Sequence, residues 1–305
     1  MNLPSHGLKL AAKRILVTGS SGVAGRFVLP LLCQQGFQVR AADMVAPPTS
    51  GNGLEFVRCD VRSPGDIRQA VQGMDAVIHL AAWHCGHQPP VSDETTFAVN
   101  VDGTFHLIQA CREAGSPPLV FASSMAYGWG SVYSVSKVLG EDLCRMYHEV
   151  TGAPVAILRY HAFVPGPYLE FGARLLRNGV DAGDVATATV AAVSAALDGR
   201  VRFFRTIIHT AHGMPEAVRQ DFSGLGPAWC DELVPGGAAL LKKYHLPLPD
   251  QVEQHDLTTA RNEISWQPAV GFREFLQDLH DRDARGEPVA RYHSPGSLRH
   301  VALRT

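Results

Sequence analysis

The sequence predicts an α/β protein with a doubly wound parallel sheet and a smaller C-terminal lobe. Short, continuously apolar runs alternate with longer amphipathic stretches through the first half of the chain. Strands of this kind are typical of parallel sheets whose two faces are both covered by helices. A glycine-rich turn also follows the first apolar run, where a strand passes into a helix in such sheets.

The predicted elements follow one another in a regular order. Strands are predicted at 14–19, 37–43, 54–60, 75–82, 118–124 and 154–160, with a further β-like run at 201–210. Helices are predicted between and after them, at 23–36, 63–72 and 97–115, around Tyr133 and Lys137, and at 184–199 and 272–286.

We divide the chain into a sheet domain at 1–165, a smaller lobe at 166–286 and a tail at 287–305. In this division the run at 201–210 rejoins the sheet or its edge. The tail is polar, basic and aperiodic, so we expect it to be poorly ordered or to pack on a partner.

The composition excludes several classes of function. The 305 residues are 46% hydrophobic and 18% charged, with a formal net charge of −2. This balance gives no basis for binding nucleic acid or an acidic membrane, and no apolar run is long enough to span a bilayer. The N-terminus lacks the apolar segment of a signal peptide. Six scattered cysteines without a Cys-x-x-Cys pair suit reduced thiols, so we expect a cytoplasmic protein.

The segment VTGSSGVAG places Gly19, Gly22 and Gly25, with Val23 among them, at the end of the first predicted strand. A tight turn with bare backbone lets a pyrophosphate approach the N-terminus of the next helix, where free N–H groups and the helix dipole favour negative charge. A plain βα turn is the alternative, but the strand–turn–helix context favours a dinucleotide site.

Two acidic residues follow at later strand ends. Asp43, 24 residues after Gly19, is placed to accept hydrogen bonds from the adenosine ribose hydroxyls. No basic residue directly follows Asp43, so the carboxylate would repel the 2′-phosphate of NADP, and we expect NAD to be preferred. Arg40 leaves binding of NADP as an alternative, because it is a cation on the same predicted strand. Asp60, with Val61 beside it, is placed to reach the adenine amine, although a helix N-terminal carboxylate is an equal alternative for Asp60.

A second polar cluster lies in FASSMAYGWGSVYSVSK, residues 121–137. Tyr133 and Lys137 are spaced i, i+4, so on a helix they leave the same face. A free tyrosine titrates near pH ~10, so base catalysis at neutral pH needs positive charge nearby, which Lys137 supplies. Ser124 lies only nine residues before Tyr133. Nine residues can span about 30 Å and neighbouring elements lie about 10 Å apart, so the three side chains can meet.

Together these motifs resemble the extended short-chain dehydrogenase/reductase (NAD-dependent epimerase/dehydratase) family. The matching segments run in family order from about residue 13 to 285: TGSSGVAG, CDVRS, HLAA, NVDGT, VFASS, YSVSK, LRYHAFVPGP, DAGDVA and ISWQPAVGFREFL. The resemblance implies an NAD-binding Rossmann domain, here 1–165, and a substrate-binding lobe, here 166–286. We also expect a small-molecule substrate and a homodimer.

The resemblance implies roles for the matched residues. Tyr133 resembles the catalytic acid/base, and Lys137 resembles the residue that lowers its pKa and holds the nicotinamide ribose. Ser124 or Ser123 resembles the hydroxyl that binds the reacting oxygen. Asn100 resembles the asparagine that props the active-site helix. Two alanines under the cofactor complete the implied contacts: Ala81 and Ala82.

The chain departs from the family in the loop between the serines and Tyr133. This loop, MAYGWG, is shorter than usual, which should leave the cleft more open on that side. We favour Ser124 because PLVFASS should keep its register and only one of two adjacent strand residues can face the cofactor. Counting back from Tyr127 and Gly128 favours Ser123 instead. The threonine-acid-acid replacement of sugar dehydratases is absent, which disfavours dehydration.

A second departure is the short segment LEFGARLLRNGV between FVPGPY and DAGDVA. Nucleotide-sugar enzymes of the family place a long nucleotide-binding insertion here. The shortening resembles members that oxidise free sugars or sugar acids, such as uronate dehydrogenases. Arg174 and Arg177 are the cations available for a substrate carboxylate or phosphate, although a solvated helix face is an equal alternative.

Three further side chains are expected to line the substrate cleft. His84 and His161 follow the strands 75–82 and 154–160, at the ends where ligands bind in open sheets, and Tyr127 lies in the shortened loop. A satisfied buried histidine is an equal alternative for His161. The segments WHCGH (83–87) and HTAH (209–212) invite a metal hypothesis, but neither gives a complete tetrahedral set, so we expect no metal site.

These observations predict an NAD-dependent oxidoreductase that transfers hydride from a hydroxyl carbon of a small sugar, sugar-acid or polyol-like substrate, with Tyr133 as acid/base. The first alternative is a nucleotide-sugar epimerase that retains its NAD. The second is an inactive NAD-binding regulatory or scaffold protein, which the shortened loops favour and the intact Tyr-x-x-x-Lys pattern opposes.

Overall fold

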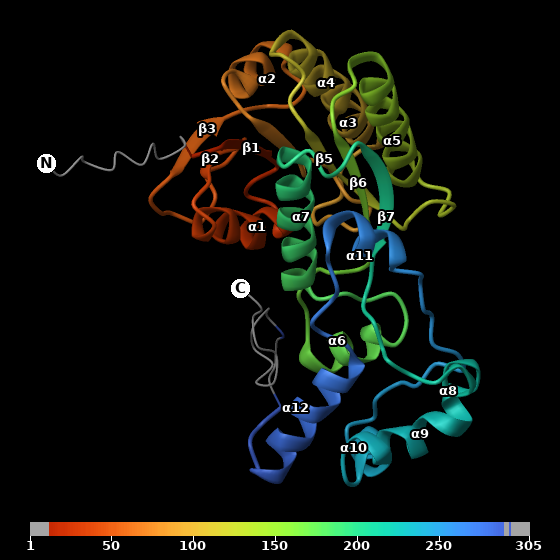
Figure 1. The fold of residues 1–305 in the computed structure, drawn as a ribbon. Coiled ribbons are helices and arrows are strands. Elements are labelled where there is room, and N and C mark those ends of the chain that lie inside the picture. The colour runs from red at the N-terminus through yellow and green to blue at the C-terminus, as the bar shows by residue number, and fades with distance from the viewer. Residues whose placement is uncertain (1–11, 290–292, 294–305) are drawn as a thin grey trace, which may run out of the picture.

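The structure, a computed structural model, describes residues 12–289 and residue 293. Its centre is a seven-stranded parallel sheet in the order β3-β2-β1-β4-β5-β6-β7 (Figure 1). The strands are β1 (Arg14–Thr18), β2 (Gln38–Asp43), β3 (Leu54–Arg58), β4 (Ala76–His79), β5 (Leu119–Ser124), β6 (Val155–Tyr160) and β7 (Phe203–Ile208). The strand order reverses between β1 and β4, which opens a crevice at the carboxyl ends of these strands. The predicted fold class is confirmed.

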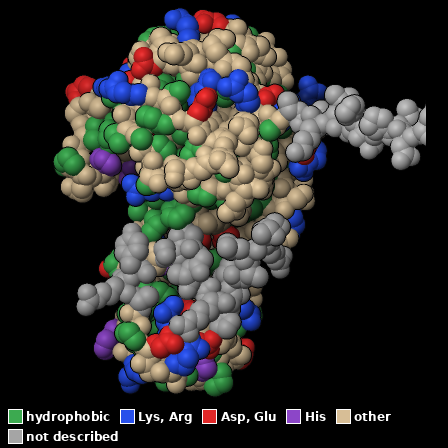
Figure 2. Space-filling model, turned by 90° about the vertical axis from the view of Figure 1, so that its left-hand side faces the viewer, with side chains coloured by type: hydrophobic (Ala, Val, Ile, Leu, Met, Phe, Trp, Pro, Cys, Tyr) green, Lys and Arg blue, Asp and Glu red, His purple; other side chains and the backbone are tan. Residues whose placement is uncertain are grey.

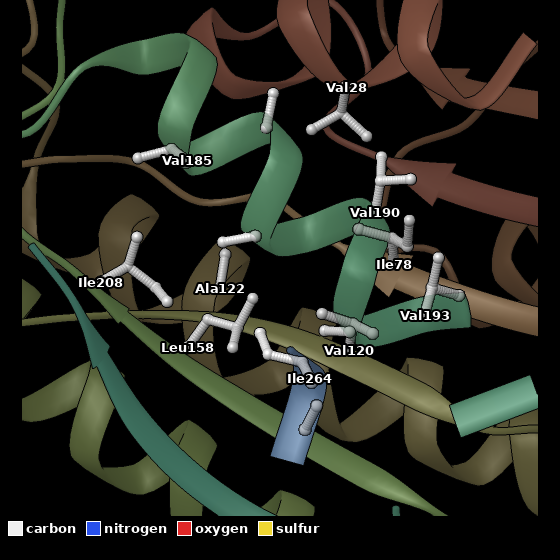
Figure 3. Close-up of a cluster of buried hydrophobic side chains, with 14 of the residues drawn as sticks. Val28, Ile78, Val120, Ala122, Leu158, Val185, Val190, Val193, Ile208 and Ile264 are labelled. Carbon is white, nitrogen blue, oxygen red and sulfur yellow. The ribbon is translucent and has the colours of Figure 1, made fainter. Parts of the chain in front are cut away.

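Helices cover both faces of this sheet. One face carries α1 (Val23–Gln34), α7 (Ala182–Leu197) and α11 (Thr258–Ile264), and the other carries α2 (Pro64–Val71), α4 (Gly103–Glu113) and α5 (Val132–Thr151). Figure 3 shows the first of these layers, where Val190 and Val193 of α7 lie over the sheet near Val120. Because both faces are buried, β1, β4, β5 and β6 contain continuous apolar runs, and their polar residues lie mainly at the carboxyl ends.

The predicted helix at 97–115 is one part of a longer helical segment. This segment begins with α3 (Asp93–Phe97), passes through a π-helical turn, η1 (Ala98–Asp102), and continues as α4. Ser92 caps its start by accepting a hydrogen bond from the amide of Thr95. A π turn inserts one residue into the helical repeat, and such turns are frequent at functional sites. Here it carries Asn100 into the protein interior.

The second lobe is a group of helices below the sheet in Figure 1. It contains α6 (Tyr168–Leu175), α8 (Glu216–Gln220), α9 (Phe222–Leu233), α10 (Gly237–Lys243) and α12 (Phe272–Ala284). It has its own core, which is rich in aromatic rings: Tyr168, Phe171, Phe222, Trp229, Phe272 and Phe275. This core holds the lobe beside the carboxyl ends of the strands.

The chain crosses between the two lobes more often than a boundary at 165 suggests. α7 and α11 pack on the sheet although both follow that boundary. The predicted run at 201–210 forms β7, which pairs with β6 along its whole length. These segments are apolar enough to cover or extend the sheet, so the segment 166–286 supplies both the smaller lobe and part of the larger one.

Two described residues of the predicted tail pack back on this chain, Val289 against the core of the smaller lobe and His293 beside Asp181. His293 is buried, stacks on the ring of Phe171 at 3.5 Å between centroids, and has its Nε2 2.7 Å from Oδ2 of Asp181. The segments 290–292 and 294–305 lie outside the described residues.

Charged side chains of both signs are interspersed over the face shown in Figure 2. This distribution fits the formal net charge of −2. Within the described ranges, no helix has the length and apolar character needed to cross a membrane.

Candidate active site

A cavity of about 1320 Å³ lies at the carboxyl ends of the strands. This is the edge at which open α/β sheets bind ligands. The cavity extends from the glycine turn after β1 to the C-terminal lobe, so one continuous space joins both predicted sites. Most of the predicted site residues line it: Gly19, Gly22, Val23, Asp43, Asp60, Val61, Ala81, Ala82, His84, Ser124, Tyr127, Tyr133, Lys137, His161 and Arg174.

The glycine turn leaves its backbone open to a ligand. Gly19 has φ +69°, and a Cβ there would lie 2.5 Å from the amide nitrogen of Ala81. Gly22 caps α1 without any side-chain hydrogen bond, so the first N–H groups of the helix face the cavity unblocked. Gly25 does not line the cavity. A Cβ on Gly25 would lie 2.2 Å from the carbonyl oxygen of Ser20, so this glycine lets the helix pack closely on the turn.

Asp43 ends β2 at the rim of the same turn. Its Oδ2 accepts a hydrogen bond from the amide of Ser21 at 2.9 Å, and its Oδ1 accepts one from the amide of Met44 at 2.7 Å. These two bonds fix the carboxylate at the place where the sequence predicts the ribose hydroxyls. Arg40 lies away from this place, because it pairs with Glu55 and donates to the carbonyl of Ala70 at 2.8 Å.

Arg26 also lines the cavity near the glycine turn, and the sequence prediction missed it. Its Nε lies 3.3 Å from the carbonyl oxygen of Ser21. It is the fourth residue after the helix cap, a position with no distinguishing pattern in the sequence. Asp60 lies deeper along the same wall, where Arg62 holds it by a hydrogen bond of 2.6 Å and keeps the pKa of its carboxyl below the usual range.

The two candidate serines have different partners. The hydroxyl of Ser124 lies close enough to that of Tyr133 to lower the pKa of the phenol, and its Oγ accepts a hydrogen bond from the amide of Ala126 at 3.1 Å. Ser123 donates to Oε1 of Glu141 at 2.5 Å. That carboxylate is buried and also accepts two bonds from Arg159, each 2.7 Å long. Of the two serines, Ser124 is therefore the one beside Tyr133.

The shortened loop returns the chain to α5 within few residues. Gly128 and Gly130 have φ values of +85° and +67°, a conformation that favours glycine. Ser131 then caps α5 in a capping box with Ser134. The loop leaves Tyr127 almost half exposed at the cavity mouth, where the guanidinium of Arg159 lies 4.7 Å from the centre of its ring.

Tyr133 and Lys137 lie on one face of α5, and both are buried. The Lys137 ammonium donates to the carbonyl of Ala122 at 2.8 Å and lies 5.9 Å from the centre of the Tyr133 ring. Burial raises the pKa of Tyr133 to about 12, and the nearby hydroxyl of Ser124 partly offsets this rise. Burial also lowers the pKa of Lys137 to about 8. The lysine therefore keeps its charge at neutral pH and stands close to losing it.

Asn100 connects the loop after β4 to the active-site helix. Its side chain accepts from the amide of Trp83 at 2.8 Å, donates to the carbonyl of Trp83 at 3.0 Å and donates to Oγ of Ser136 at 2.9 Å. Asn100 does not line the cavity, so it acts by positioning its neighbours.

His84, the residue after Trp83, packs edge-on against Tyr133 with 4.5 Å between ring centroids. Burial, followed by the charge of Lys137, lowers the pKa of His84.

The far wall of the cavity comes from segments that follow β6. His161 is buried there and Arg174 donates to the carbonyl of Val164 at 2.8 Å. Two lining residues on this wall were missed: Glu253 and His255. They lie in a loop about 90 residues beyond His161 in the sequence. Only the packing of the C-terminal lobe brings them together, so no local pattern could reveal them.

A glycine turn on a parallel sheet, opening onto a half-buried Ser and a buried Tyr and Lys, defines a dinucleotide-dependent site of the short-chain dehydrogenase type. Comparison with known proteins agrees. The chain belongs to the NAD-dependent epimerase/dehydratase family, whose model matches residues 15–180. This confirms the family resemblance of the sequence motifs and the expectation of an NAD-dependent family.

The similar curated proteins include two uronate dehydrogenases. The protein from Agrobacterium fabrum (strain C58) is 31% identical over 171 residues, which are 51% of this chain and 63% of that protein. The protein from Pseudomonas putida (strain KT2440) is 27% identical over 172 residues, which are 50% of this chain and 62% of that protein. The match thus spans a little under two thirds of each relative.

A solved structure gives a matching picture. The uronate dehydrogenase from Agrobacterium tumefaciens, a mutant complexed with NAD, aligns over 78% of this chain and 91% of its own chain. The TM-score is 0.58 and the sequences are 25% identical. These relatives are named uronate dehydrogenases, so the expected resemblance to the shorter members of the family is confirmed.

Proposed function

We propose that this chain is an NAD-dependent dehydrogenase that oxidises a hydroxyl-bearing carbon of a small sugar acid of the uronate class. The observation that carries the proposal is the contact of Ser124 with Tyr133, beside Lys137, in the same cavity as the glycine turn. These side chains provide hydrogen bonding and proton transfer at one point, where a hydroxyl group can enter.

The glycine turn fits a dinucleotide. A Cβ at Gly19 would strike the backbone of Ala81, so the turn keeps a bare surface beside the open N-terminus of α1. Asp43 lies at the rim for the ribose hydroxyls, and Lys137 lies at the far end for the nicotinamide ribose. NAD bound along this line would supply the acceptor for the hydride.

The protein side chains handle the proton. Ser124 is placed to hold the substrate hydroxyl oxygen, and Tyr133 is placed to remove its proton through Oη. Burial alone would keep Tyr133 protonated at neutral pH, because it raises the tyrosine pKa to about 12. Lys137 opposes this with a positive charge that persists below pH about 8.

The size of the C-terminal lobe supports a small substrate. Between β6 and α7 the chain forms only one short helix, α6, which packs against α12 in the core of the lobe. No separate nucleotide-binding segment lies between these elements. Arg174 lines the cavity on the same side and offers a cation for a carboxylate.

An assay with free and nucleotide-linked substrates tests this function. The full chain is incubated with NAD and either galacturonate or glucuronate, and NADH formation is followed by absorbance. Stoichiometric NADH from a free uronate supports the proposal. Epimerisation of UDP-glucuronate without net NADH would instead establish the epimerase alternative, and NAD binding without turnover of either class would establish an inactive binding protein.

We also infer that the protein is a homodimer through α3, α4 and α5. These helices lie together on one side of the molecule (Figure 1) and carry exposed apolar residues: Phe97, Phe105, Val135 and Val138. Exposed apolar clusters of this kind mark protein interfaces. Analytical ultracentrifugation should give a dimer that Phe105→Glu dissociates; a wild-type monomer contradicts the inference.

We place the protein in the cytoplasm, because all six cysteines are free thiols and four of them are buried. Fractionation of the source cells, with detection by antibody, tests this location.

A further inference from the structure

Four histidines form a cluster outside the group that contains Tyr133, and two of them, His161 and His255, line the cavity. His161 follows β6 and His209 follows β7, so the parallel pairing of these strands sets the two rings side by side, 4.3 Å apart between centroids. His255 packs against both, at 4.6 Å from His161 and 5.1 Å from His209. His212 lies 6.0 Å from His209. The proton-transfer residues use none of these rings.

Several ring nitrogens in this cluster lack a directed hydrogen bond. Among the described residues, Nε2 of His161, Nε2 of His255 and both ring nitrogens of His209 are buried without a partner. Buried polar atoms are nearly always paired, so each such atom requires an explanation. An unmodified neutral histidine has a lone pair on one nitrogen, which is the atom that ligates metal ions.

The approach of Glu253 to His255 points to a cation between them. Oε1 of Glu253 lies 2.9 Å from Nε2 of His255, yet the two atoms make no directed hydrogen bond. A carboxylate oxygen and a nitrogen lone pair repel each other at this separation unless a positive charge lies nearby. A metal ion bound by both atoms would supply that charge and hold them slightly farther apart.

We propose that His161, Glu253 and His255 bind one divalent transition-metal ion of the zinc class. One ligand atom from each residue lies within 4.8 Å of the other two. Ligands at about 2.0–2.2 Å from a tetrahedral ion lie about 3.4 Å apart. The widest span must therefore close by up to about 1.4 Å, and Glu253, whose side chain is 50% exposed, has the freedom to move.

The surroundings suit this ligand set. Two imidazoles and one carboxylate are ligands that zinc accepts, with a fourth position left open. All three residues line the cavity, so the open position faces the space where a substrate would enter.

The test measures metal binding and does not depend on any substrate. The untagged full chain is stripped with a chelator, then titrated with Zn²⁺ against a chromogenic chelator and with Co²⁺ by visible absorption. We expect one equivalent of each ion and the intense visible bands of tetrahedral Co²⁺. His255→Ala and His161→Ala should weaken binding by about 100-fold or more, since loss of an outer-sphere partner alone costs 10–100-fold. Glu253→Gln should weaken it by at least about 10-fold.

The control is His87→Ala, which removes a histidine from the separate group at 83–87 and should leave metal affinity unchanged. Circular dichroism and NAD binding check that each variant folds. If His161→Ala does not fold, the metal affinity of His255→Ala decides the result. Failure of the wild-type chain to bind a stoichiometric ion overturns the proposal, as does a loss in His87→Ala equal to that in His255→Ala. Inactivity toward uronates leaves this result unaffected.

Discussion

The hydroxyl of Ser123 lies 2.5 Å from Oε1 of Glu141, whereas the hydroxyl of the next residue, Ser124, lies near that of Tyr133. Both serines line the cavity, but their hydroxyls have different partners, one a buried carboxylate and the other a tyrosine. Alternation of side chains along the strand produces this division. It also makes the two serines a matched pair for mutation.

Ser124→Ala should lower kcat/KM by about 10²–10³, the loss seen when one donor to a reacting oxygen is removed. Ser123→Ala should leave kcat/KM near the wild-type value. It should instead lower the free energy of unfolding by about 1–3 kcal/mol, because the buried Glu141 loses a partner. Steady-state kinetics and urea unfolding of both variants distinguish the roles. A larger kinetic loss in Ser123→Ala would show that the assignment is reversed.

Tyr133→Phe should abolish turnover, with a loss of at least about 10²–10⁴, and leave NAD affinity nearly unchanged, because only its hydroxyl serves the reacting oxygen. Lys137→Ala should reduce both turnover and NAD affinity. Calorimetry with NAD and single-turnover kinetics separate binding from chemistry.

A control for this pair is Tyr147→Phe on the same helix. The Tyr147 hydroxyl donates to the carbonyl of Pro117 at 2.8 Å, away from the cavity. This variant should lose about 1 kcal/mol of stability and keep its turnover. If Tyr133→Phe turns over at the wild-type rate, Tyr133 is not the acid/base.

Asp43→Ala should weaken NAD binding by about 1.5–3 kcal/mol, the contribution of a hydrogen bond to a charged group, and narrow the preference for NAD over NADP. Arg40→Ala is the matched control. Arg40 pairs with Glu55 and with backbone carbonyls, so its removal should not change the preference. Calorimetry with NAD and with NADP gives the ratio of the two affinities for each variant. Tighter binding of NADP than NAD by the wild-type chain would contradict the preference itself.

The sheet and the family motifs could be predicted from the sequence because their signals are local. Continuous apolar runs mark buried parallel strands, and the strand register favours Ser124 as the serine that faces Tyr133. The wall formed by Glu253 and His255 could not be predicted. Their loop is fixed by contacts far away in the sequence, such as the bond from the amide of Val252 to the carbonyl of Arg219.

The return of α7 and α11 to the sheet was missed for a related reason. Their apolar faces, including Val193 and Ile264, fit either lobe by composition. Which lobe they cover depends on the space left open on the sheet beside α1. The hydrophobic pattern can predict that such a helix forms, but only the tertiary structure determines which elements it packs against.

The final prediction concerns the stability of the fold in acid and the role of His79, which is the last residue of β4 and is buried. Its Nδ1 lies 2.6 Å from Oγ1 of Thr18, and its Nε2 lies 3.1 Å from Oγ1 of Thr104. Burial, followed by the charge of Lys137, lowers its pKa to about 3 from 6.5. Below pH 6.5 the unfolded chain therefore binds a proton that the folded chain does not, so stability falls as the pH drops toward 3.

By pH 4 this one residue should cost on the order of 3 kcal/mol, at about 1.4 kcal/mol per pKa unit. His79→Gln keeps an amide donor and acceptor between the two threonines but cannot titrate. It should be less stable than wild type at pH 7, yet its free energy of unfolding should fall less between pH 6.5 and pH 4. The exposed His87→Gln should keep the wild-type slope. Urea unfolding at several pH values measures the slopes, and equal slopes for His79→Gln and wild type would show that His79 takes up a proton in the folded protein.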